Sequence, residues 1–240
     1  SATDPVGFID NNVHGALTML EVARLSPKLR RFILISTDEV YGPGATIHNP
    51  LVPHYRPSSP YAASKACQEL IAQPYHTTFR VPLTTVTISN MFGPRQSQLA
   101  FTPQVIRKLR EGSKIDVHVD RNGKPGGRHY SFVSDVAHYL IRNLHGDAHD
   151  YQSLKERLHV PGHEYVSNDD LVRILHRVSR ITTPVDDIIK HVAVYDERPG
   201  HDIDYGSLAG DPEWQPFTPM YSAYHETWDW YNLHPEWLES

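Results

Sequence analysis

The sequence has almost no cysteine and no long apolar run. Cys67 is the only cysteine among the 240 residues, so no disulfide can form within the chain, and a reducing compartment such as the cytoplasm is expected. No apolar stretch approaches the roughly 18 residues that a membrane-spanning helix needs, and no signal-peptide pattern opens the chain. These absences predict a cytoplasmic chain with no membrane partner.

An excess of basic residues is also missing. The chain has 23 Lys and Arg against 28 Asp and Glu, a net charge of −5, which gives no general attraction to nucleic acid or to an anionic membrane. The 16 histidines are scattered, and no Cys/His spacing typical of a metal site occurs. We therefore expect neither a nucleic-acid partner nor a bound metal ion.

A glycine-rich loop that opens a helix, the usual cradle for phosphates, is not found in these residues either. The nearest candidate is residues 123–127, which lie between two strand-like runs at 115–119 and 128–133. This pattern predicts a hairpin loop instead of a phosphate-binding turn.

The most informative stretch that is present covers residues 31–42. Its apolar run at 32–35 predicts a strand buried on both faces of an α/β sheet. Thr37, Asp38 and Glu39 follow at once, and we name these three residues the acidic turn. Ligands of open α/β sheets bind beyond the carboxyl ends of the strands, where the acidic turn should lie. A helix cap or Asx turn is an alternative, but it does not explain the second carboxylate.

A second motif follows some twenty residues later. Ser59 and Pro60 predict a helix start, which places Tyr61 and Lys65 four residues apart on one helix face. A phenol has a pKa of about 10, and a neighbouring ammonium lowers it. A Tyr-x-x-x-Lys pair can therefore take a proton from an alcohol during hydride transfer. The spacing alone is common by chance, and the acidic turn makes it specific.

With these motifs the chain resembles the extended short-chain dehydrogenase/reductases, most closely the dTDP-glucose 4,6-dehydratases. The matching segments are Ser-Thr-Asp-Glu-Val-Tyr-Gly at 36–42, Pro-Ser-Ser-Pro-Tyr-x-Ala-Ser-Lys-Ala at 57–66, Asn-x-x-Gly-Pro at 90–94 and Arg-Pro-Gly-His-Asp at 198–202. The acidic turn is the part that separates the dehydratases of this group from its epimerases and decarboxylases.

The resemblance implies an α/β fold: the C-terminal part of a Rossmann-type doubly wound parallel sheet plus a smaller α/β substrate-binding lobe. Residues 1–93 would be the remainder of the dinucleotide-binding domain, to which a strand at 157–160 returns, and residues 94–240 would mostly form the lobe. A helix at 5–25 and the Tyr-Lys helix would pair with their copies in a homodimer.

The front of the family's nucleotide-binding domain would precede Ser1, so the chain is expected to be part of a longer protein or a truncated relative. The strand at 32–36 would then need pairing on both sides, by residues upstream of Ser1 or by another chain. Without those residues, we expect the 240 residues alone to bind NAD weakly or not at all.

The implied activity is that of a lyase: NAD-dependent dehydration of a nucleotide-activated hexose to a 4-keto-6-deoxy sugar nucleotide. The catalytic residues carried over from the family are Thr37, Asp38, Glu39, Tyr61 and Lys65, of which Tyr61 and Lys65 would also contact NAD. The residues that would contact the nucleotide-sugar substrate are Asn90, Arg128 and His201, although a plain turn asparagine is an equal interpretation of Asn90.

Two departures leave the nucleotide and the sugar open. Residues 98–100 are Gln-Leu-Ala where the family has Pro-Glu-Lys, and Ile203-Asp204 stand where an arginine is usual near the diphosphate. One alternative is therefore a non-catalytic protein that keeps the fold for assembly or binding. Another is a related sugar-nucleotide epimerase or decarboxylase, which the adjacent carboxylates of Asp38 and Glu39 disfavour.

Overall fold

The computed structural model describes residues 4–45, 54–145, 156–162, 164–193 and 214–239. The helices and strands of these residues, in chain order, are α1 (Pro5–Ile9), η1 (Asp10–His14), α2 (Gly15–Arg24), β1 (Phe32–Thr37), η2 (Asp38–Tyr41), α3 (Pro60–Thr77), β2 (Leu83–Ile88), β3 (Asn90–Phe92), α4 (Phe101–Glu111), β4 (Ile115–Val119), β5 (Gly127–Phe132), α5 (Val133–His145), β6 (Arg157–Val160), β7 (Glu164–Ser167), α6 (Asn168–Ser179), α7 (Val185–Ile188), β8 (Ile189–Ala193), α8 (Met220–Leu233) and η5 (Pro235–Trp237).

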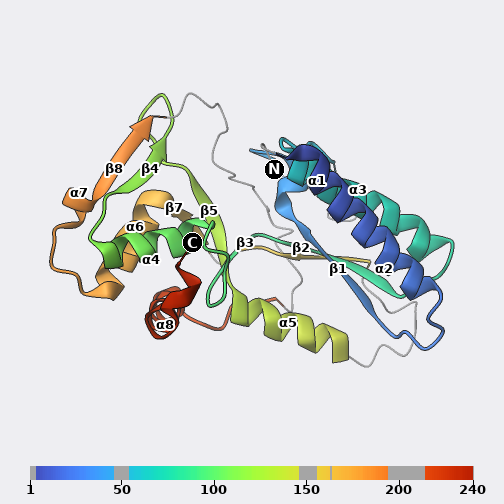
Figure 1. The fold of residues 1–240 in the computed structure, drawn as a ribbon. Coiled ribbons are helices and arrows are strands. Elements are labelled where there is room, and N and C mark those ends of the chain that lie inside the picture. The colour runs from blue at the N-terminus through green and yellow to red at the C-terminus, as the bar shows by residue number, and fades with distance from the viewer. Residues whose placement is uncertain (1–3, 46–53, 146–155, 163, 194–213, 240) are drawn as a thin grey trace. The chain divides into compact units, whose positions relative to one another are not determined.

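The chain divides into two compact units. The first contains α1, α2, α3 and the strands β1, β2 and β6, whereas the second contains the remaining strands with α4, α6, α7 and α8 (Figure 1). The division falls within α5, where Tyr139 is the first residue assigned to the first unit. Both units combine parallel strand pairs with helices, so the predicted α/β class is confirmed.

The sheet of the first unit is parallel, with the order β1-β2-β6. All six residues of β2 are buried, as expected for a central strand, and β6 returns to the sheet from far along the chain. Apolar side chains from α2, α3, β1, β2 and the segment just before β2 form the core beneath the helices: Leu20, Ala23, Leu34, Ala72, Tyr75, Val81 and Leu83. This core lies under the first half of β1, before the strand reaches the acidic turn.

The single helix predicted at 5–25 is interrupted. The π-helical turn η1 separates α1 from α2, and it contacts α3 through Asn12. The Asn12 carbonyl accepts a hydrogen bond from Gln68 Nε2 at 2.6 Å, and its Nδ2 donates to Ser64 Oγ at 2.8 Å. π-helical turns often occur at functional sites, and this one ties the first helical segment to the helix that carries Tyr61 and Lys65.

The hairpin predicted around residues 123–127 is wrong. β4 pairs in parallel with β8, whereas β5 pairs with β3 and β7, and only an isolated bridge from Val119 to Pro125 joins the two runs. The turn itself is tight, since Asp120 Oδ1 accepts the N–H groups of Asn122 and Lys124, each at 2.8 Å. Beyond that turn β4 and β5 diverge, because β4 pairs along its length with β8 whereas β5 pairs with β3 and β7.

The second unit is packed around aromatic rings. Phe92 of β3 and Tyr224 of α8 stack with their ring centroids 4.2 Å apart, and both side chains are fully buried. Among the described residues, no helix is long and apolar enough to cross a lipid bilayer. Within the same residues, no group of three or more His, Cys, Asp and Glu side chains is arranged to hold a metal ion.

Candidate active site

The acidic turn begins at the carboxyl end of β1. Thr37 is the last residue of that strand, and its Oγ1 accepts a hydrogen bond from the Glu39 N–H at 3.3 Å, so that it caps η2. Asp38 is buried with 3% of its surface exposed, and Glu39 is half-buried. The cap interpretation is thus correct for Thr37. A cap needs only that hydroxyl, however, and does not explain why a carboxylate next to it is buried.

Gly42 ends the turn. Its φ of 82° lies in the left-handed region, and a Cβ at this position would lie 2.3 Å from the carbonyl oxygen of Arg56. The Arg56 N–H also donates to the carbonyl of Val40 at 3.0 Å. The segment around Arg56 therefore approaches the turn so closely that only glycine fits.

Helix α3 starts as predicted. Ser59 Oγ accepts the N–H of Ala62 at 3.1 Å, and Pro60 occupies the first helical position. Tyr61 and Lys65 follow one turn apart, and both are half-buried. The local chemistry of the chain thus sets where this pair begins.

The phenol of Tyr61 shares an electrostatic environment with the acidic turn. Burial is the largest cause that raises the pKa of Tyr61, and the negative charges of Glu39 and Asp38 raise it further. The structure thus brings Tyr61 and both carboxylates together. The direction is opposite to the lowering of the Tyr61 pKa that we expected from Lys65, because burial and two carboxylates dominate at this phenol.

Lys65 instead holds the edge of β1. Its Nζ donates to the carbonyl oxygen of Ile35 at 2.6 Å. Because the N–H of Phe32 donates to Pro82 beside β2, the alternation of a parallel ladder turns the backbone groups of Ile35 toward the opposite edge of β1. Burial lowers the pKa of Lys65, and the carboxylate of Glu69 opposes that effect.

The two predicted substrate-binding residues that the structure describes, Asn90 and Arg128, lie in the second unit. Asn90 begins β3 and Arg128 lies on β5, and both are half-buried. The strand register pairs Asn90 with Tyr130, so Arg128, two residues earlier, shares a sheet face with Asn90. Arg128 Nη1 donates to the carbonyl of Gly127 at 2.8 Å. His201 lies outside the described residues, as do Ile203 and Asp204.

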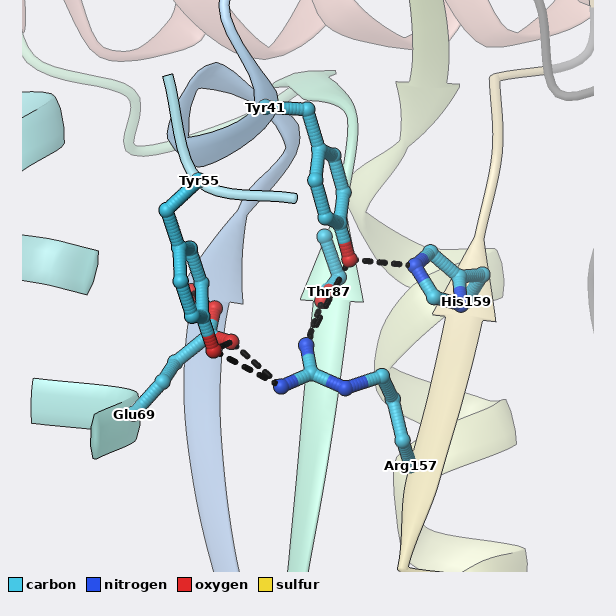
Figure 2. Close-up of polar contacts among 7 residues, drawn as sticks. Tyr41, Tyr55, Glu69, Thr87, Arg157 and His159 are labelled. Carbon is cyan, nitrogen blue, oxygen red and sulfur yellow. Dashed lines mark hydrogen bonds and ion pairs between the residues drawn. The ribbon is translucent and has the colours of Figure 1, made fainter. Parts of the chain in front are cut away.

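Sequence reasoning missed a buried ionic network next to the acidic turn. Arg157 of β6 donates to Glu69 of α3 at 2.5 Å, and their side chains are 6% and 0% exposed (Figure 2). The hydroxyl of Tyr55 donates to the same Glu69 oxygen at 2.8 Å. The position of Glu69, one helical turn after Lys65, was a signal that it faces the sheet. No comparable signal in the sequence indicated its partner Arg157, which lies 88 residues further along the chain.

His159, two residues after Arg157 on β6, is expected to make the stability of the first unit depend on pH. Its Nε2 lies 2.7 Å from the hydroxyl of Tyr41, and burial together with the charge of Arg157 lowers its pKa from 6.5 to about 4. Between these pH values the unfolded chain binds more protons than the folded one, so the free energy of unfolding falls as the pH falls. The stabilisation is complete above about pH 6.5, is lost as the pH drops through about 4, and amounts to about 3 kcal/mol.

Urea unfolding measured across this pH range tests that expectation, with His159→Gln as the matched variant. Glutamine can still hydrogen-bond to Tyr41 but does not titrate, so the variant should show a flatter dependence on pH. Equal pH dependence in both proteins would contradict the assignment to His159.

The chain is similar to named sugar-nucleotide dehydratases. The NAD dependent epimerase/dehydratase family matches residues 1–152. The dTDP-glucose 4,6-dehydratase of Xanthomonas campestris pv. campestris is 32% identical over all of this chain and 70% of its own length. The enzyme of the same name from Salmonella typhimurium is 30% identical over all of this chain and 71% of its own.

Solved structures show the same fold. DesIV, a dTDP-glucose 4,6-dehydratase from Streptomyces venezuelae solved with NAD and TYD bound, matches all of this chain and 71% of its own with a TM-score of 0.80 at 26% identity. A UDP-glucuronic acid 4-epimerase from Bacillus cereus, at 20% identity and a TM-score of 0.76 over 94% of this chain and 68% of its own, shares the fold. NAD is the cofactor of the family, and this chain belongs to the NAD dependent epimerase/dehydratase family.

Proposed function

We propose that this protein catalyses the NAD-dependent dehydration of a nucleotide-activated hexose to a 4-keto-6-deoxy sugar nucleotide. The observation that carries the proposal is the acidic turn, where two adjacent carboxylates, one of them buried, follow the carboxyl end of β1. Relatives at about 30% identity named dTDP-glucose 4,6-dehydratase support the same reaction. The single, exposed Cys67 supports a cytoplasmic location, which cell fractionation would check.

Each residue of the site has a role in this reaction. Tyr61 takes the proton from the sugar 4-hydroxyl as a phenolate while Thr37 hydrogen-bonds to the same oxygen; the positive charge of oxidised NAD, when bound, would offset the two carboxylates that raise the pKa of this phenol. The resulting 4-ketone acidifies the C5 proton, which Glu39 removes as a carboxylate base. Asp38 donates a proton to the hydroxyl that leaves C6. Two crowded carboxylates suit these roles because one can be protonated while the other is charged.

The residues present fit the nicotinamide end of NAD. The phenol of Tyr61 and the ammonium of Lys65 are donors on one helix face, suited to the ribose hydroxyls, and both are half-buried beside the strand end. When bound, NAD would accept a hydride from C4 of the sugar and return it to C6. The sequence shows no glycine-rich loop opening a helix, so the residues that would hold the pyrophosphate are not among these 240.

We assign the two ends of the substrate to different parts of the chain. Residues 1–93, with the strand at 157–160, would form the part of the dinucleotide-binding domain that faces the sugar. Residues 94–240 would mostly form the lobe that binds the nucleotide. The contacts to the nucleotide would come from Arg128 and His201 of this lobe, together with Asn90 at the boundary between the two parts. Alanine at Arg128 should raise KM for the sugar nucleotide more than it changes kcat, which steady-state kinetics would measure.

The reaction is tested with the product of the complete reading frame, NAD and dTDP-glucose or UDP-glucose labelled with deuterium at C4. The expected product has lost one water and carries the label at C6, with a solvent hydrogen at C5. Inversion at C4 without loss of water would identify an epimerase instead. No turnover of either sugar nucleotide would favour the non-catalytic alternative and overturn the proposal.

We also propose that the protein is a homodimer that pairs through the helical segment at 5–25 and the Tyr-Lys helix α3. Several large apolar side chains of α1 and α2 point into solvent, among them Val6, Met19 and Val22. An apolar outer face on a helix such as α2, which already buries Leu20 and Ala23, is typical of a helix-bundle interface. Light scattering should give the mass of two chains, and a single-chain mass at working concentration would contradict this.

The outer edge of β1 should carry a further strand. Among the described residues β1 pairs only with β2, and Lys65 occupies the outward carbonyl of Ile35. A strand that paired there, from upstream residues or another chain, would cover the outward N–H groups of Ile33 and Ile35. Hydrogen exchange in the product of the complete reading frame should find these two amides protected. Fast exchange at both would contradict the pairing.

A further inference from the structure

The helix-facing side of the first sheet changes from apolar to polar toward the acidic turn. Leu34 on β1 and Leu83 on β2 belong to the core beneath α3. Two residues beyond Leu34, the register aligns Ser36 with Thr87, and Thr87 with His159. Side chains aligned in this way lie on one face, so a row of polar groups crosses all three strands under α3.

Glu69 connects this row to the front of the acidic turn. It accepts a hydrogen bond from the hydroxyl of Ser36, the residue immediately before Thr37, and its other oxygen accepts from Arg157 Nη2 at 2.5 Å. Glu69 lies on α3 one turn after Lys65. It therefore joins the helix of the Tyr-Lys pair to the strand that carries the acidic turn.

Tyr41 connects the row to the back of the acidic turn. Its hydroxyl lies 2.7 Å from His159 Nε2 and accepts from Arg157 Nη1 at 3.4 Å (Figure 2). Arg157 Nη1 also donates a hydrogen bond to Thr87 Oγ1 at 3.2 Å. Arg157 thus reaches both flanks of the turn, through Glu69 on one side and Tyr41 on the other.

We propose that Ser36, Tyr41, Glu69, Arg157 and His159 form a clamp that positions the acidic turn for elimination. The clamp rests on the proposed function for its catalytic meaning. Its members are assigned no contact with the reacting atoms, so they are positioning residues. Only four residues lie between the anchored ends Ser36 and Tyr41, so they have little freedom to move, and catalytic groups must be held to within about 0.5 Å. The clamp supplies this restraint to Asp38 and Glu39, whereas Tyr61 is held separately by α3.

Two single-hydroxyl variants test the clamp, one at each end: Ser36→Ala and Tyr41→Phe. Both leave the Glu69–Arg157 ion pair in place. The matched control is Tyr75→Phe, which removes another tyrosine hydroxyl bonded to a carboxylate, 2.5 Å from Glu21 Oε1, in the same unit and away from the turn. Hydrogen exchange of the peptide covering residues 36–42 should be several-fold faster in both clamp variants and unchanged in the control.

Catalysis in the product of the complete reading frame provides the second readout. Each clamp variant should lower kcat by about 10- to 100-fold with little change in KM, because a displacement of about 1 Å costs a catalytic group that much. Since Tyr61 stays in place, oxidation of the sugar should continue and reduced cofactor should accumulate, which its absorbance reports. A merely structural defect would slow both steps together.

Unchanged exchange in both variants overturns the clamp. Faster exchange with unchanged kcat, or with no accumulation of reduced cofactor, overturns its role in positioning the acidic turn for elimination. If the unmodified protein dehydrates no sugar nucleotide, the proposed function fails, while the exchange comparison still decides whether these side chains hold the turn.

Discussion

Replacing Tyr61 with phenylalanine is expected to lower kcat by about 10²–10⁴-fold while the protein stays folded. The phenol is the only group of the candidate site assigned to the 4-hydroxyl proton, and phenylalanine cannot accept it. Tyr61 is half-buried, and its ring contacts Phe8 edge-on with centroids 6.2 Å apart, a contact that phenylalanine preserves. Steady-state kinetics should show the loss in kcat, and thermal unfolding should show little change.

The control for this variant is Tyr221→Phe. Tyr221 lies on α8 with 49% of its surface exposed, and the reaction assigns it no role. Its replacement should leave kcat and the unfolding temperature unchanged. A Tyr61→Phe variant that retains wild-type kcat would remove the basis for the proposed reaction, since the hydroxyl of Tyr41, the other phenol next to the acidic turn, is bonded to His159 and Arg157.

The second large effect concerns stability. Replacing Arg157 with leucine is expected to lower the free energy of unfolding by about 3–5 kcal/mol, because it leaves a buried carboxylate without its counter-ion. The Glu69 side chain is 0% exposed, and besides the Arg157 guanidinium it accepts hydrogen bonds from the hydroxyls of Ser36 and Tyr55. Urea unfolding followed by circular dichroism would measure the change.

Two further variants frame this result. Replacing both partners, as Glu69→Leu with Arg157→Leu, should recover part of the loss because no charge is left buried. Arg24→Leu removes an ion pair of the same unit, to Glu21 at 2.6 Å, that is exposed to water and should matter far less. An Arg157→Leu variant as stable as Arg24→Leu would show that the buried pair does not hold the sheet and α3 together.

The motifs of the candidate active site could be predicted from the sequence because their geometry is local. Ser59 and Pro60 set the start of α3, and helical periodicity then places Tyr61 and Lys65 on one face. The apolar run at 32–35 ends at the acidic turn, so the strand and the turn are neighbours by covalent connection. Spacing and propensity act over a few residues, and these elements need nothing more.

Pairing at long range was decided only by the tertiary structure. The separation of β4 from β5 was not predictable, because a tight turn at Asp120 is compatible with a hairpin as well as with two diverging strands. Lys65 donates to the carbonyl of Ile35, and that carbonyl faces outward only because β2 pairs with the other edge of β1. Likewise, the raised pKa of Tyr61 reflects burial and two carboxylates that a helical spacing cannot report.

The clamp shows the same limit most clearly. Arg157 begins a strand whose other residues are buried, and nothing in that segment names a carboxylate on a helix 88 residues earlier as its partner. The partner follows from the order β1-β2-β6, which aligns Ser36, Thr87 and His159 across three strands under α3. A charge can be buried there only because the assembled sheet and helix surround it with its counter-ion and with hydrogen-bonding hydroxyls, and those neighbours exist only once the chain has folded.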